Sequence, residues 1–104
     1  MRLVFCSAPP EHADRIATAL VERRLAACVS VVPQIASTYR WQGKIERATE
    51  ALLIVKTTAD RLVELMTELP ALHPYEVPEI VAIDVREGDV LPAYLAWVIA
   101  ETRG

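Results

Sequence analysis

The chain has 104 residues, 53% of them hydrophobic, and its 14 acidic residues outnumber 11 basic ones for a net charge of −3. This is the usual size of one domain, so we expect a single domain over residues 1–104. The acidic balance disfavours a nucleic-acid partner, because phosphate binding leaves a basic excess or stripe. No apolar run approaches the roughly 20 residues of a membrane span, and the N-terminal run is too short for a signal peptide. We therefore expect a cytoplasmic protein with no membrane partner.

The first half of the chain predicts a strand, a helix and a long hairpin. The apolar residues 3–6 form a strand, and Pro9-Pro10 can open the helix that follows. From residue 28 the alternation has period two, which is typical of a strand and continues to Trp41. Gln42-Gly43 predicts a tight turn, and residues 44–57 return as the next strand. Pro33 cannot donate to a ladder, so it predicts a bulge or an edge.

The second half predicts a helix, a strand and a last helix. Thr58 can cap a helix with an apolar stripe, and Pro70 is expected to end it. The strand over residues 80–85 is almost continuously apolar, so we expect it to be covered on both faces or to lie at an interface. The final helix opens near residues 89–92 and carries Tyr94 and Trp97.

Between the second helix and the last strand lies a stiff loop. Pro74 and Pro78 fix their own backbone and push the residues before them toward extended geometry, which excludes a helix. A loop of this kind holds its side chains at set angles, as binding loops on rigid scaffolds do. Those side chains are His73, Tyr75, Glu76 and Glu79.

The predicted order is β-α-β-β-α-β with an added C-terminal helix, an α+β fold of the ferredoxin-like class. Each arm of the central hairpin has about 14 residues, on the order of 45 Å at the usual strand rise and well over twice the common length. The distal part carries apolar side chains that the two short strands cannot cover. Another subunit must cover them, so we expect a homo-oligomer.

Six motifs in register span nearly the whole chain: Cys6-Ser7-Ala8-Pro9, Leu25-Ala26-Ala27-Cys28-Val29, Tyr39-Arg40-Trp41-Gln42-Gly43-Lys44-Ile45, Lys56-Thr57, His73-Pro74-Tyr75-Glu76-Val77-Pro78-Glu79-Ile80, and Gly88-Asp89 followed by Tyr94-Leu95-Ala96-Trp97. Together they resemble the divalent-cation tolerance family called CutA. The resemblance implies a ferredoxin-like fold in a tight homotrimer, with hairpins pairing across subunits. It also implies a cytoplasmic role in tolerance of copper and other divalent cations, by direct binding or by signalling, and no catalytic activity.

The resemblance also implies a candidate metal site. Some members bind copper through a cysteine of the first strand and two histidines before the Pro-Tyr motif, and these positions fall on Cys6, Leu72 and His73. Leu72 cannot bind a metal, so the site is incomplete. Copper prefers thiolate and imidazole ligands, and Glu76 or Glu79 could add an oxygen. We therefore expect weak binding of copper or another divalent cation by Cys6 and His73.

The alternative for these two residues is structural. Cys6 would pack in the core, and His73 would be a solvated loop residue hydrogen-bonded to the backbone. A disulfide from Cys6 to Cys28 is not expected, because the second strand is not adjacent to the first in a split βαβ sheet. No third residue orients Cys6 and His73 as a nucleophile pair, so we expect no enzyme.

A second functional hypothesis uses the same loop without metal. Aromatic side chains with a few convergent charges are what a small-ligand site requires. Such a site would make the protein a trimeric signalling or assembly module that binds a small molecule or partner protein at the subunit junction, as the trimeric P-II regulators of similar fold do. The alternative is that the aromatic residues are only trimer contacts. The candidate residues are Tyr39, Trp41, Lys56, Tyr75 and Glu79.

Overall fold

The computed structural model describes residues 1–103, which fold into four strands and three α-helices. Their order along the chain confirms the sequence prediction. The elements are β1 (Arg2–Ala8), α1 (Pro10–Glu22), β2 (Cys28–Trp41), β3 (Lys44–Thr57), α2 (Ala59–Leu72), β4 (Ile80–Asp84), a 3-10 turn (Glu87–Asp89) and α3 (Pro92–Thr102).

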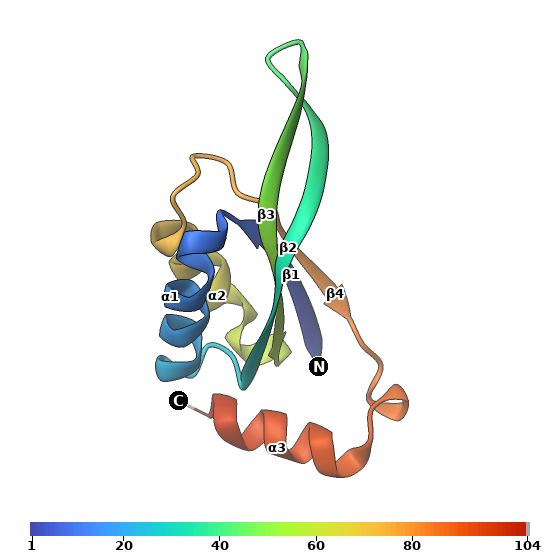
Figure 1. The fold of residues 1–104 in the computed structure, drawn as a ribbon. Helices are drawn as coiled ribbons and strands as arrows, with labels where there is room; N and C mark the ends of the chain where they lie inside the picture. The colour runs from blue at the N-terminus through green and yellow to red at the C-terminus, as the bar shows by residue number, and fades with distance from the viewer. Residues whose placement is uncertain (104) are drawn as a thin grey trace.

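The strands form one sheet in the order β2-β3-β1-β4, and every neighbouring pair is antiparallel. Helices α1 and α2 cover one face, and α3 lies across the end opposite the hairpin tip (Figure 1). This is the ferredoxin-like α+β arrangement that the sequence predicted. β2 is separated from β1 by β3, and Cys6 and Cys28 are both free thiols, as expected.

The core lies between the sheet and the two covering helices. Alternate residues of the central strands point into it, and the pairing of β1 with β3 sets Val4 opposite Val55 and Cys6 opposite Leu53. Ile16 of α1 and Leu65 of α2 pack from the other side and are fully buried. Truncating such a residue to alanine costs about 2–5 kcal/mol. This core supports the loop between α2 and β4.

The hairpin has arms of 14 residues each and projects beyond the helices (Figure 1). Gln42 and Gly43 both have positive φ, 50° and 81°, as the predicted tight turn requires. The ladder shifts register between Val32 and Ile35, next to Pro33, which confirms the predicted bulge.

Two predictions about element ends are wrong in detail. Pro70 lies inside α2, which continues to Leu72, because a proline near the end of a helix removes only one hydrogen bond before the helix stops. The helix ends where Pro74 holds His73 in extended geometry, with φ −87° and ψ 139°. Thr58 precedes α2 as predicted, but its side chain makes no capping hydrogen bond.

The last strand is covered on one face only within the chain. Ile80 and Ala82 pack against the core, whereas Val81 and Ile83 are exposed. Of the two alternatives for this strand, coverage on both faces by its own chain is therefore wrong. None of the helices within residues 1–103 is both long and apolar enough to cross a bilayer.

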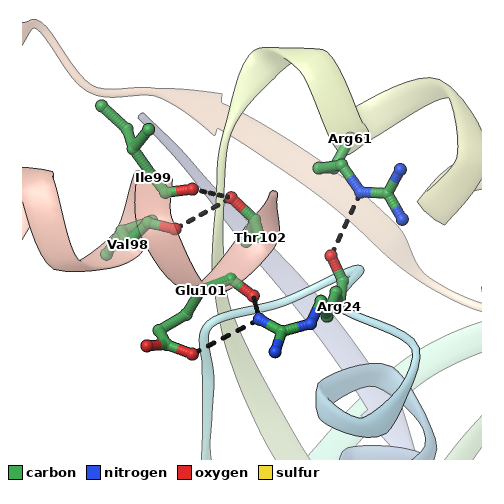
Figure 2. Close-up of polar contacts among 6 residues, drawn as sticks. All are labelled: Arg24, Arg61, Val98, Ile99, Glu101 and Thr102. Carbon is green, nitrogen blue, oxygen red and sulfur yellow. Dashed lines mark hydrogen bonds and ion pairs between the residues drawn. The ribbon is translucent and has the colours of Figure 1, made fainter. Parts of the chain in front are cut away.

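A polar junction fixes the C-terminal end of α3 (Figure 2). Arg24, which follows α1 with a positive φ of 57°, donates from Nη1 to the Glu101 carbonyl at 3.1 Å and pairs with its Oε2 at 3.5 Å. The Arg24 carbonyl in turn accepts from Nε of Arg61 in α2 at 3.1 Å. Thr102 bonds back to the Val98 carbonyl. The end of α3 is thus tied to both covering helices.

Candidate functional site

The loop from His73 to β4 is anchored by the histidine. His73 is only 7% exposed, its Nε2 lies 2.7 Å from the Ser7 carbonyl, and its Nδ1 accepts from the Tyr75 backbone N–H at 3.1 Å. A carbonyl can only accept, so Nε2 carries the proton and the ring is neutral. The prediction of a solvated histidine is wrong in its burial and right in its backbone hydrogen bonds. Both ring nitrogens are already engaged by the protein.

Cys6 lies in the core beneath this loop. Its side chain is fully buried, and its Sγ donates a weak hydrogen bond to the Ser7 carbonyl at 3.8 Å. Burial, with the charges of Glu79 and Glu50, raises the pKa of the Cys6 thiol to about 12. The thiol is therefore protonated at neutral pH, whereas copper and related ions bind the thiolate.

The structure does not assemble a metal centre around Cys6 and His73. Coordination by both would need ionisation of a buried thiol and loss of one of the two hydrogen bonds of the His73 ring. Within residues 1–103, no three His, Cys, Asp or Glu side chains are grouped closely enough to hold a metal ion. The geometry matches the structural alternative for this pair.

A cleft of about 680 Å³ lies instead between the distal part of the hairpin and the proline-braced loop. Four of the five predicted ligand residues line it. The lining residues are Ser7, Ser37, Thr38, Tyr39, Trp41, Glu50, Pro74, Tyr75, Glu76, Val77 and Glu79.

Lys56, the fifth predicted ligand residue, does not line the cleft. Its ammonium group contacts the Ser30 hydroxyl and lies 3.7 Å from Sγ of Cys28. It pairs with Leu3 near the start of β1, whereas the cleft lies at the other end of that strand, where Ser7 lines it. The structure therefore assigns Lys56 to a separate environment.

Glu50 is the site residue that sequence reasoning missed. It is 6% exposed, and its Oε2 accepts a 3.1 Å hydrogen bond from the Tyr75 hydroxyl. The available signal was a charged residue directly before the apolar run of residues 51–55. Burial, and then the nearby carboxylate of Glu50, raises the pKa of Tyr75 to about 12, so its hydroxyl remains a donor.

The bulge near Pro33 places the aromatic residues of the hairpin on the side of the cleft. Past it, Tyr39 pairs with Glu46, which shares a face with Glu50 four residues along β3. If the same sequence paired without a bulge, unbroken alternation would put Tyr39 on the core-facing side, with Val31. Trp41, two residues after Tyr39, lies on the same face because side chains alternate along the strand.

The cleft is acidic and aromatic. Within residues 1–103, the residues that line it include three glutamates and no Lys, Arg or His. Its three aromatic side chains are partly open to solvent, with Tyr39 45%, Trp41 50% and Tyr75 39% exposed. The ring of His73 packs behind Tyr75 at a centroid distance of 4.9 Å. These features are those of a ligand site with fixed walls.

Comparison with known proteins gives consistent results. Residues 2–101 match the family described as CutA1 divalent ion tolerance protein. The divalent-cation tolerance protein CutA of Thermus thermophilus is 48% identical over 101 residues, 96% of each chain.

Solved structures agree over the whole fold. The PII-like protein CutA from Nostoc sp. PCC 7120, in its apo form, superposes with a TM-score of 0.94 at 36% identity, covering 99% of this chain and 98% of that one. The periplasmic divalent cation tolerance protein CutA from Archaeoglobus fulgidus gives 0.92 at 39% identity, covering 99% and 100%.

Proposed function

The chain belongs to the CutA1 divalent ion tolerance family, and from this membership we propose that it acts in divalent-cation tolerance as a homotrimeric ligand-binding protein. Its recognition site is the cleft beside Trp41 and Tyr75, at the subunit junction, rather than the Cys6 and His73 pair. One observation carries the proposal: the cleft is open and lined by aromatic side chains that are partly exposed to solvent, whereas the ring nitrogens of His73 are both engaged.

The shape of the protomer supports a homotrimer. The arm beyond the bulge presents Trp41 and Ile45 at 50% and 54% exposure, and β4 presents Val81 and Ile83. The sheet also ends in two unpaired edges, β2 and β4, which a soluble protein covers. Light scattering should give three times the 11.6 kDa mass of one chain. A stable monomer at micromolar concentration would contradict this assembly.

A binding role, rather than catalysis, follows from the same chemistry. The family is named for ion tolerance and for no reaction. A nucleophilic thiol needs a lowered pKa and access to substrate, and Cys6 has neither. We place the protein in the cytoplasm, because its two cysteines are free and the cytosol keeps thiols reduced. The Archaeoglobus relative, in contrast, is called periplasmic. Cell fractionation tests this location.

The second candidate function is weak copper binding by Cys6 and His73. Calorimetric titration with copper distinguishes it from ligand binding in the cleft. We expect wild type and His73→Ala to bind Cu²⁺ equally and weakly. Cys6→Ser serves as the matched control, since it removes the other ligand. Circular dichroism of each variant verifies that it is folded. A specific copper site in the wild type that both substitutions remove would overturn the proposal in favour of direct metal binding.

A further inference from the structure

The charge of the cleft defines the kind of ligand that it would take. Glu50 is 94% buried, since only 6% of it is exposed, and within residues 1–103 its carboxylate has one hydrogen bond, from the Tyr75 hydroxyl to Oε2. A carboxylate this far from water is costly without a positive partner. Glu76 and Glu79 add negative charge at the opening, and none of the described lining residues is basic. The site therefore attracts a cation.

The walls of the cleft favour an organic cation over a metal ion. Tyr39, Trp41 and Tyr75 offer ring faces, which attract ammonium and guanidinium groups within about 6 Å of the ring centroid. The volume of about 680 Å³ suits a drug-sized molecule and is far larger than one ion. The three carboxylates are not gathered at one point, since residues 1–103 contain no group of three potential metal ligands.

We propose that the cleft binds a small organic cation, a primary ammonium or guanidinium group on an apolar stem, with Glu50 as its counter-charge and the three aromatic side chains as its walls. This proposal rests on the proposed function, because both place the ligand in the same cleft. The second oxygen of Glu50 receives the charged group, and the stem lies along Trp41. Glu79 contributes attraction at the rim, where solvent screens it.

Three probes of one shape and different charge test the proposal: phenethylammonium, neutral phenethyl alcohol and the anion hydrocinnamate. Binding is followed by the NMR shifts of the Trp41 indole N–H in the whole assembly, with Trp41→Phe to assign the signal. We expect the ammonium probe to bind and the other two to bind at least about tenfold more weakly, as loss of a charge-assisted hydrogen bond predicts. Equal binding of all three would overturn the proposal.

Matched variants locate the counter-charge. Glu50→Gln keeps the acceptor for Tyr75 but removes the charge, and should weaken the ammonium probe about tenfold. Glu87→Gln removes one charge from the exposed 3-10 turn and should leave binding unchanged. If both variants weaken binding equally, general attraction accounts for it and the site is wrong. Glu79→Gln, at an exposed position, gives a second arm should Glu50→Gln misfold.

The same chemistry could come from a neighbouring copy, because the hairpin end carries exposed Arg40, Lys44 and Arg47. A combined replacement of these three by serine distinguishes the sources. Binding of phenethylammonium to the wild type identifies a free molecule as the ligand. Binding only to the triple variant identifies a basic side chain of another copy as the resident cation. Binding to neither overturns the proposal, whatever the copper titration shows.

Discussion

The Tyr75 hydroxyl donates a 3.1 Å hydrogen bond to Oε2 of Glu50, and this bond joins the proline-braced loop to β3 across a distance of 25 residues in the chain. It is the one described hydrogen bond of a nearly buried carboxylate. Its loss should therefore be felt in stability as well as in binding.

Tyr75→Phe should lower the free energy of unfolding by about 1–3 kcal/mol, because it leaves the Glu50 carboxylate buried without its donor. Urea denaturation at a fixed protomer concentration measures the change, since an oligomer's stability depends on concentration. In the Glu50→Gln background the same substitution should lower the free energy of unfolding by less, because an unpaired buried amide is less unfavourable than an unpaired buried carboxylate. Equal costs in both backgrounds would show that the two side chains are not coupled.

Alkaline pH should destabilise the protein through Tyr75. Its pKa is raised from 10.0 to about 12 in the folded state by burial and then by Glu50, so between these values the unfolded chain binds fewer protons than the folded one. The free energy of unfolding therefore falls as pH rises through this window, and the contribution is fully present below pH 10. Urea titrations across the window should show a shallower fall for Tyr75→Phe than for the wild type.

Cys6 should resist alkylation in the folded protein. Its pKa of about 12, against 9.0 for the free thiol, leaves on the order of a thousandfold less thiolate near neutral pH, and burial blocks the reagent as well. In a Cys28→Ser background, iodoacetamide should label Cys6 at least a hundredfold more slowly in buffer than in urea, by the same argument. Mass spectrometry follows the labelling. Rapid labelling of the folded variant would contradict the buried thiol.

Arg24 should tolerate glycine better than alanine. Both substitutions remove the contacts to Glu101 that Figure 2 shows. Only glycine relieves the positive φ of 57°, which costs an L-residue roughly 1–2 kcal/mol. We expect Arg24→Ala to be less stable than Arg24→Gly by about 1 kcal/mol in urea denaturation. The reverse order would mean that the left-handed geometry is not retained.

Local patterns were sufficient to predict the fold. Period-two alternation over β2 and β3, helical spacing in α1 and α2, and the turn at Gln42-Gly43 gave the element order, and the two separated βαβ halves gave the sheet. The end of α2 was misplaced at Pro70, because the sequence does not show how many residues a helix continues past a proline in its last turn.

The site was only partly predictable. Tyr39, Trp41, Tyr75 and Glu79 line one cleft, and the sequence grouped them because aromatic and acidic residues cluster in the hairpin and the stiff loop. Grouping Lys56 with them was wrong. Lys56 and Glu50 lie six residues apart on the same strand, which separates them by roughly 20 Å.

Two further features of the site could not be predicted from local sequence patterns. In the sequence, Glu50 looks like any polar residue of a strand, because its hydrogen-bond partner Tyr75 comes from a distant segment. The inward turn of His73 toward Ser7 was invisible for the same reason, because only the packed loop brings them together.

The bulge next to Pro33 makes the chain sensitive to a change in length at one point. Loss of a single codon there, for example that of Gln34, would remove the extra residue, so Tyr39 would still pair with Glu46 but the bend and added twist that a bulge gives its strand would be lost. Every residue of the cleft would still be encoded, yet the aromatic residues of the hairpin would be turned relative to the loop that faces them. Among homologous genes, the spacing between this proline and the hairpin tip is therefore the feature to compare first.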